Sequence, residues 1–138
     1  MRVVDRRNRD ERRGGAVVEL AFVAPLFILL ILGLIESARL GMVAQLLTTA
    51  AREGCRVAII YGSTQTTVQN AVDQVLAGSG ISVGTVNPTP SNWQTISNGS
   101  AVTVSLSVPY SSVSWLPTPL FLGGTTISAS ATMSSENP

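Results

Sequence analysis

The chain has 138 residues, of which 45% are hydrophobic and 12% are charged, and its formal net charge at pH 7 is +1. It contains a single cysteine, Cys55, so an intrachain disulfide is excluded. It contains no histidine, the residue that most often serves as a metal ligand or general base. Only six charged side chains follow Glu36. We therefore expect a protein that is not an enzyme, with no catalytic residues, no metal, no cofactor and no small-molecule substrate.

The first 14 residues, MRVVDRRNRDERRG, carry six of the nine arginines. Such a basic arm could bind nucleic acid, but this one ends where an apolar run begins. Positive charge beside an apolar helix more often fixes membrane topology, with the positive side in the cytoplasm. We predict a basic cytoplasmic leader peptide at residues 1–14 and no nucleic-acid partner.

An apolar run of 21 residues, residues 15–35, follows the leader. As a helix it would span about 31 Å, close to the thickness of the hydrocarbon core of a bilayer. A secretory signal peptide is the alternative, but its apolar region usually has about 7–15 residues and precedes a small-x-small cleavage site. The nearest candidate site here ends in Glu36-Ser37-Ala38, with an acid where a small residue belongs. We predict a single transmembrane segment at residues 15–36.

Glu19 lies within this run, whereas the segment from Leu20 to Ile35 has no charge. A charge in hydrocarbon costs at least about 2.5–3.5 kcal/mol, so an acid at this position is expected to have a partner. The alternative is that the side chain of Glu19 extends to the membrane surface and meets water there.

The helical pattern continues beyond the apolar run. Apolar and small residues recur at steps of three and four, which is the period of one helix face. These residues are Leu40, Val43, Leu47, Ala50, Gly54, Val57 and Tyr61. The opposite side carries Arg39, Gln45, Thr49, Arg52, Glu53 and Arg56. We predict a single helix over about residues 16–60, whose amphipathic half, residues 37–60, packs against a head domain.

Three charged residues on the polar side of this helix, Arg52, Glu53 and Arg56, are candidates for contact with a partner. The alternative is a solvated helix face, on which Glu53 and Arg56 form an i,i+3 ion pair. Cys55 is expected to be a small packed residue rather than a reactive thiol.

Residues 61–138 are predicted to form an extracytoplasmic head. Gly62-Ser63 interrupts the helical pattern, and a second, shorter amphipathic helix is expected at about residues 66–77. Beyond Gly78 the apolar period changes to two, which indicates half-buried strands of an antiparallel sheet. The clearest strands cover residues 102–108 and 127–133, and shorter candidates lie at 81–86 and 93–96.

Asn98-Gly99 is a hairpin-type turn that would join the candidate strand at residues 93–96 to the strand that begins at Ala101. The segment between the two clear strands contains an apolar loop, residues 115–122. This loop either covers the core or, if it is exposed, forms a patch that requires a partner. The fold class expected from these elements is α+β, with a long N-terminal helix, a short second helix and a small antiparallel β-sheet.

Gly14 and Glu19 have a specific spacing. A cut after Gly14 would give a mature chain that begins Gly15-Ala16-Val17-Val18-Glu19, with glutamate as its fifth residue. This resembles the type IV prepilin signal, in which a basic leader ends in glycine and an aspartyl prepilin peptidase cleaves at the cytoplasmic face of the membrane. Because Gly14 and Gly15 are both glycines, a cut after Gly15 is the alternative, and it would make Glu19 the fourth residue of the mature chain.

The resemblance assigns Gly14 and Gly15 to the processing site, and it also supplies Glu19 with a partner. In a bundle of helices the carboxylate of Glu19 could neutralise the free α-amino group of a neighbouring subunit.

Two segments are similar to the characteristic blocks of the TadE-like proteins of tight-adherence (Flp-type) pilus systems. The first is Arg12-Arg13-Gly14 with Ala16-Val17-Val18-Glu19-Leu20-Ala21 and Pro25-Leu26, and the second is Ala50-Ala51-Arg52-Glu53-Gly54-Cys55-Arg56-Val57-Ala58. The similarity covers the first 60 residues well and the remainder loosely. Leu20 stands where the family usually has Phe or Tyr.

The resemblance implies a type IV pilin-like fold and a minor pilin or pseudopilin that takes part in assembly of a type IVb (Flp/Tad) cell-surface pilus. The implied partners are the prepilin peptidase, other major and minor pilins and the pilus assembly platform. The candidate contact residues are Glu19, Arg52, Glu53 and Arg56.

Together with the basic leader, the resemblance implies a single-pass protein of the cytoplasmic (inner) membrane. The N-terminus would be cytoplasmic, and the head would be extracytoplasmic and available for incorporation into the pilus. The alternative is an uncleaved single-pass membrane protein with an extracytoplasmic binding or sensor domain.

Overall fold

The computed structural model describes residues 7–136 of the chain, with side chains from Gly14 to Glu136. The chain divides into two compact units, Met1–Ile35 and Glu36–Pro138. The predicted leader, residues 1–14, lies almost entirely outside the described side chains.

Helix α1 covers Arg7–Ala58, with Pro25 inside it, and therefore contributes to both units. The prediction of one long helix is confirmed. Within Gly14–Ala58 an 18-residue window has a mean hydropathy of 2.7 and is not buried inside the protein. The helix is therefore long and apolar enough to cross a membrane, and the exposure of this window argues against the core helix of a soluble protein.

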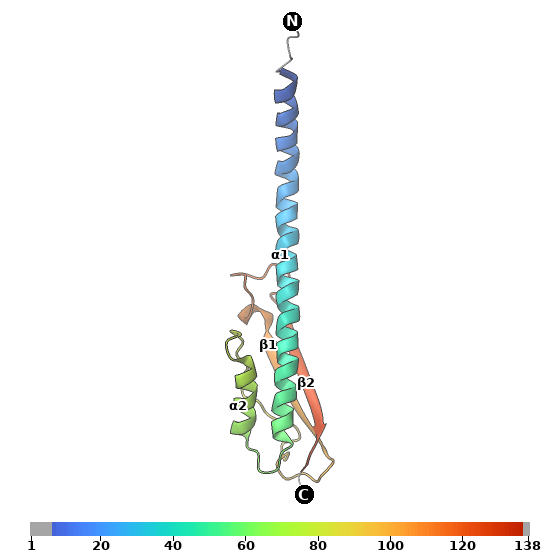
Figure 1. The fold of residues 1–138 in the computed structure, drawn as a ribbon, viewed down its shortest axis with the longest axis vertical. Coiled ribbons are helices and arrows are strands. Elements are labelled where there is room, and N and C mark those ends of the chain that lie inside the picture. The colour runs from blue at the N-terminus through green and yellow to red at the C-terminus, as the bar shows by residue number, and fades with distance from the viewer. Residues whose placement is uncertain (1–6, 137–138) are drawn as a thin grey trace. The chain divides into compact units, whose positions relative to one another are not determined.

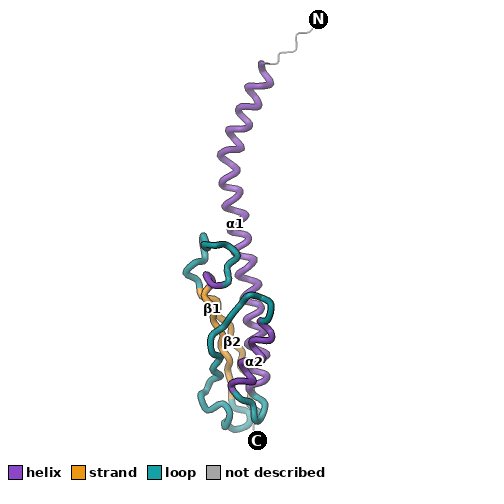
Figure 2. The backbone as a smooth tube through the Cα atoms, turned by 90° about the vertical axis from the view of Figure 1, so that its left-hand side faces the viewer, coloured by secondary structure: helices purple, strands orange, loops and turns teal. Residues whose placement is uncertain are grey.

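The second unit contains the remaining helix and the strands. After residues 36–58 of α1 come α2 (Gln65–Leu76), β1 (Ala101–Pro109), a 3₁₀ turn (Tyr110–Ser112) and β2 (Thr126–Ser134). The two strands form an antiparallel pair in which Val104 lies opposite Ala131. Figures 1 and 2 show α2 and the strands beside the second part of α1. The predicted α+β architecture is therefore confirmed.

The core of the second unit lies where α1, α2 and β1 meet. Its buried aliphatic residues follow the periods of their elements, with steps of three and four on the helices and two on β1. They include Val43, Leu47 and Ala51 of α1, Val68, Val72 and Leu76 of α2, and Val102, Val104, Leu106 and Val108 of β1. On β2 Ile127 is the one buried residue, while Ala129, Ala131 and Met133 are partly buried against the core.

The bounds of α2 have local causes. Thr64 is its N-cap, and the Thr64 hydroxyl accepts a hydrogen bond from the backbone N–H of Thr67 at 3.3 Å. The hydroxyl of Thr67 accepts in return from the backbone N–H of Thr64 at 2.9 Å, which completes a capping box. Beyond the helix Gly78 has φ of +76°, a conformation that favours glycine.

The predicted short strands at residues 81–86 and 93–96 are wrong, since neither segment is a strand. The side chains of α2, rather than a neighbouring strand, bind the backbone of the first segment: the N–H of Val86 donates to Gln69 Oε1 at 2.8 Å. The second segment forms local turns, in which the N–H of Trp93 donates to the carbonyl of Pro90 at 2.9 Å. Both segments contain buried apolar residues, and this burial produced the strand-like pattern.

The expected hairpin at Asn98-Gly99 is also wrong. Gly99 has φ of +81°, as a tight turn requires, but its N–H donates to the carbonyl of Ser135 at 2.9 Å. The turn therefore closes against the end of β2 and joins no pair of neighbouring strands.

Gly54 makes the closest approach between α1 and its neighbours. A Cβ atom at this position would lie 2.7 Å from Val72 Cγ2 and 3.5 Å from Val104 Cγ1. The first distance is shorter than any normal carbon contact, and valine has little rotamer freedom with which to move away. Glycine is required at this position by packing, although it weakens the helix.

We predict that Gly54→Val destabilises the head by about 1–3 kcal/mol or more, because extra methyl groups would force α2 and β1 away from α1. The matched control is Gly41→Val, where an added Cβ meets nothing within 4 Å. The measurement is urea unfolding of the full chain in detergent, followed by tryptophan fluorescence. Equal midpoints for the two variants would contradict the packing described for Gly54.

Candidate functional site

Gly14 and Gly15 both lie within α1 and are exposed. A Cβ atom added to either glycine would meet nothing within 4 Å among the described residues. Glycine inside a helix is less favourable than alanine by about 1 kcal/mol. Packing therefore gives no reason for two glycines here, in contrast to Gly54.

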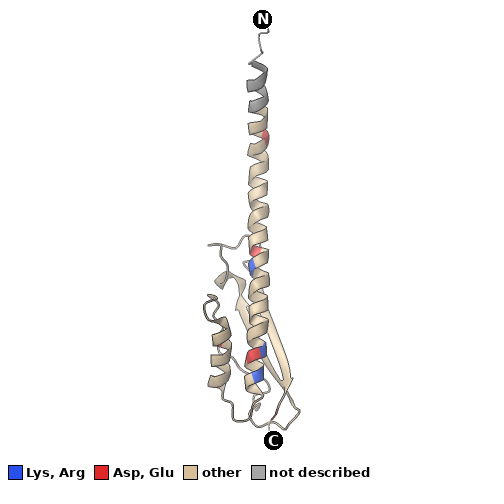
Figure 3. Ribbon diagram, viewed as in Figure 1, with Lys and Arg blue, Asp and Glu red and all other residues tan. Residues whose placement is uncertain are grey.

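Glu19 projects from a part of α1 whose neighbouring side chains are apolar and exposed. Val18 and Leu20 beside it are 57% and 63% exposed, and Phe22 is 79% exposed. In the sequence no charged residue occurs between Glu19 and Glu36, and Figure 3 draws the uncharged parts of α1 in tan. Among the described side chains, no hydrogen bond or ion pair to the carboxylate of Glu19 is found. An acid on an apolar surface, with no partner among the described side chains, is the arrangement expected of a group that pairs with another charged group.

The charged residues near the end of α1 do not form a single cluster. Glu53 and Arg56 form a bidentate pair, with Arg56 Nε 3.0 Å from Glu53 Oε2 and Arg56 Nη2 2.5 Å from Glu53 Oε1. They border a surface hollow between α1 and α2 that Asn70 and Asp73 also line. Arg52 instead borders a separate hollow formed by α1 alone, together with Gln45 and Thr48.

The Glu53–Arg56 pair shifts both pKa values. Hydrogen bonds from Arg56 lower the pKa of Glu53, and the same bonds raise the pKa of Arg56. The contribution of Glu53 to stability is therefore present at neutral pH and is lost as the pH falls through its lowered pKa. Because both side chains are largely in water, this contribution is small. A role in contact with a partner remains a prediction for this pair.

Cys55 is fully buried in the core, as expected of a small packed residue. Its Sγ lies 3.3 Å from the carbonyl oxygen of Val102 in β1 and is placed to donate to it. Burial raises the pKa of the thiol, although backbone N–H groups of Met133 and Val104 act in the opposite direction. The reactive thiolate is therefore disfavoured at neutral pH.

Sequence reasoning missed the role of Glu36, which is buried and 1% exposed. Its carboxylate accepts hydrogen bonds from the backbone N–H groups of Leu120 and Phe121, the second at 3.1 Å. The hydroxyl of Tyr110 donates to the backbone carbonyl of Glu36 at 3.1 Å. Glu36 thus fixes the apolar loop, residues 115–122, against the start of the second unit.

Arg39 was predicted on the solvated side of the helix, and this is wrong, because it is only 4% exposed. Its Nε donates to the carbonyl of Val113 at 2.8 Å, and its Nη2 lies 3.4 Å from the carbonyl of Ser79. The guanidinium carbon lies 4.9 Å from the centroid of the Trp115 ring, within the range of a cation–π contact. Backbone carbonyls and an aromatic ring thus replace the water around this charge.

The sequence contains a signal for Glu36 and Arg39. An acid and an arginine three residues apart, at the end of an apolar run, lie on one side of a helix. Their partners could not be identified, because those partners are backbone groups between 40 and 85 residues away.

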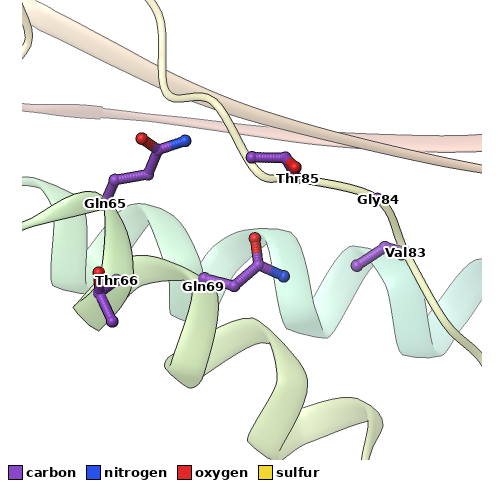
Figure 4. Close-up of a pocket in the computed structure, with 6 residues that line it drawn as sticks. All are labelled: Gln65, Thr66, Gln69, Val83, Gly84 and Thr85. Carbon is purple, nitrogen blue, oxygen red and sulfur yellow. The ribbon is translucent and has the colours of Figure 1, made fainter.

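A surface hollow of about 520 Å³ lies between α2 and the extended segment at residues 83–85 (Figure 4). Figure 4 shows two glutamines of α2, Gln65 and Gln69, on the helix side of it. Both amides hold the adjacent chain: Gln65 Nε2 donates to Asn87 Oδ1 at 2.7 Å, and Gln69 Oε1 accepts from Val86. The lining is uncharged. Within the part of the chain that the structure describes, no group of acidic, histidine or cysteine residues could hold a metal ion.

Comparison with protein-family models matches residues 14–56 to a family described as TadE-like protein. The matched segment contains Gly14, Gly15, Glu19, Arg52, Glu53 and Arg56. It also contains Glu36 and Arg39. No curated protein and no solved structure matches the chain.

We predict that Glu36→Ala releases the apolar loop without unfolding the head. Hydrogen bonds to a charged group contribute about 1.5–3 kcal/mol, so exchange of the Leu120 and Phe121 amides should accelerate about tenfold or more. The measurement is hydrogen–deuterium exchange of the full chain in detergent, read from peptides that cover residues 118–122.

The matched control for this experiment is Glu53→Ala, which removes an exposed acid from the same helix. It should leave exchange in the loop unchanged. Equal exchange rates in the Glu36→Ala variant and the unmodified chain would show that the carboxylate does not hold the loop.

Proposed function

We propose that this chain, a member of the TadE-like family by the match over residues 14–56, is a minor pilin or pseudopilin. In this role it takes part in assembly of a type IVb (Flp/Tad) cell-surface pilus. The observation that carries the proposal is Glu19, an exposed acid on an apolar helix four residues after Gly15, which has no bonded partner among the described side chains. The role is structural rather than enzymatic.

Membrane insertion of residues 15–36 is the first step of the proposed mechanism. This part of α1 exposes large apolar side chains such as Phe22, Leu26 and Phe27, at 79%, 70% and 59%. Hydrocarbon is the environment in which such a surface is stable. The arginines of residues 1–14 favour a cytoplasmic N-terminus, and therefore an extracytoplasmic head.

Removal of the leader by a prepilin peptidase is the second step. Gly14 and Gly15 have no packing role in the described structure, so a requirement of the peptidase for a small residue at the cut accounts for them better than the fold does. Cleavage after Gly14 creates a new α-amino group on Gly15, about 6 Å along the helix from Glu19.

Lateral association with other pilins is the third step. In an isolated subunit Glu19 can extend to the membrane surface and be solvated. In a bundle its carboxylate can pair with the α-ammonium of a neighbour. The pair forms in a poorly solvated setting, where removal of one partner leaves the other charge buried. The head then determines which partners join, and the exposed Arg52 and Glu53–Arg56 pair are candidate contacts.

We predict that the mature protein in the cell membrane begins at Gly15. Intact mass and N-terminal sequencing of the membrane fraction measure this directly. Gly14→Leu should leave the precursor uncut, whereas Gly15→Ala should be processed normally. A chain that retains Met1 would support the alternative of an uncleaved single-pass protein with an extracytoplasmic binding or sensor domain. A reversed response of the two variants would move the cut to the position after Gly15.

We predict that Glu19→Ala is inserted and cleaved but does not associate with its pilin partners. Loss of one member of a buried ion pair costs about 3–5 kcal/mol, whereas alanine only improves compatibility with the membrane. The measurement is co-purification of the cleaved variant with major and minor pilins, together with a count of pili.

The matched control for Glu19→Ala is Leu20→Ala, which changes the neighbouring exposed residue without removing a charge. It should retain most of the association. If Glu19→Ala associates and assembles pili as the unmodified chain does, Glu19 serves only to contact the membrane surface.

We predict that an impermeant maleimide labels Asn98→Cys in intact spheroplasts, because Asn98 is exposed and the head is extracytoplasmic. Cys55 in the unmodified chain should stay unlabelled until the protein is denatured, since it is 0% exposed and burial raises the pKa of its thiol. Labelling of Asn98→Cys only after lysis would reverse the proposed topology.

A further inference from the structure

We propose that the apolar loop, residues 115–122, lies in the headgroup region of the membrane on the side of the head and acts as a second membrane contact. This inference rests on the proposed insertion of residues 15–36. It adds a lipid surface as the partner of a specific part of the head.

The loop is exposed although it is rich in apolar residues. Trp115 is 62% exposed, Leu120 is 48% exposed and Phe121 is 65% exposed. No charged residue occurs between Asp73 and Glu136, so the loop and the strands around it are uncharged. Exposed apolar side chains grouped in this way mark a surface that contacts something other than water.

The contact between the loop and Glu36 indicates that the partner of the loop is the lipid surface. The carboxylate of Glu36 binds the N–H groups of Leu120 and Phe121, so the loop is held beside Glu36. In the sequence, Glu36 directly follows Ile35, the last residue of the uncharged run. A membrane span that ends at Ile35 places Glu36 at the membrane surface, and the backbone bound to its carboxylate lies at the same level.

The side chains of the loop fit a lipid interface. Tryptophan is enriched at the level of lipid headgroups, because its ring is apolar and its N–H is polar. The guanidinium of Arg39 lies against the Trp115 ring and is itself bonded to the carbonyl of Val113, which fixes the position of the ring. Leu120 and Phe121 supply further exposed apolar side chains in the same loop. A neighbouring protein subunit could also cover such a patch, and the experiment below separates the two cases.

The two tryptophans of the chain provide the test. Trp93 is 5% exposed in the core and Trp115 is 62% exposed in the loop. The full chain is reconstituted into phosphatidylcholine vesicles whose lipids carry bromine high on the acyl chains, as a quencher of tryptophan fluorescence. The variant Trp93→Phe reports on Trp115 alone, and the matched control Trp115→Phe reports on Trp93 alone.

We expect brominated lipid to remove most of the Trp115 emission and to leave the Trp93 emission unchanged. Aqueous acrylamide should quench Trp115 weakly in vesicles. Introducing Leu120→Ser and Phe121→Ser into the Trp93→Phe chain should reduce the quenching by brominated lipid and increase the quenching by acrylamide. The same pair of substitutions in the Trp115→Phe chain should leave the Trp93 emission unchanged, which verifies that the head is folded.

Two results would overturn the inference while leaving the proposed function intact. Strong quenching of Trp115 by acrylamide, with none by brominated lipid, would place the loop in water. Protection of Trp115 from both quenchers would mean that protein covers it. Release of the chain from the vesicles by alkaline carbonate would overturn the membrane insertion itself, and this inference with it.

Discussion

The close packing of the second half of α1 against α2 and β1 is the contact on which the head depends. The face of α1 that makes this contact is lined by small residues, including Ala50, Ala51, Gly54 and Cys55, all of which are fully buried. Small side chains bring the backbone of α1 close to Val72 of α2 and Val104 of β1. A two-stranded sheet is marginal by itself, so its stability derives from this contact.

The main elements could be predicted from the sequence because each buries one face with its own period. The steps of three and four in α1 and α2 and the alternation in β1 and β2 reflect the same core. The prediction failed where a different kind of contact satisfies the backbone. Around Val86 the amide of Gln69 replaces a neighbouring strand, and a single-sequence pattern contains no sign of that exchange.

The residues of the candidate site also differ in how much of their role the sequence reveals. Gly14, Gly15 and Glu19 stay predictions: the sequence singles them out because an acid lies in an apolar run at the spacing of a prepilin signal, and the structure adds that the two glycines have no packing role among the described residues. The spacing of Glu36 and Arg39 at the end of the apolar run was a signal as well, but the distant backbone groups that these two side chains bind could not be identified from the sequence. Their burial gives the second unit a fixed loop next to the point where the uncharged run ends.

In the proposed arrangement α1 meets two environments, hydrocarbon along residues 15–35 and a protein core along one face of residues 36–58. Glu19 is the residue that the first environment does not explain, and the proposed pilin bundle supplies the missing partner. The most direct test is a zero-length carbodiimide crosslink in membranes that contain the unmodified protein, analysed by mass spectrometry. The account predicts an amide bond between the Glu19 carboxyl and the N-terminal amine of a neighbouring mature pilin. Recovery of Glu19 in an uncrosslinked peptide, under conditions in which other pilin carboxylates react, would contradict it.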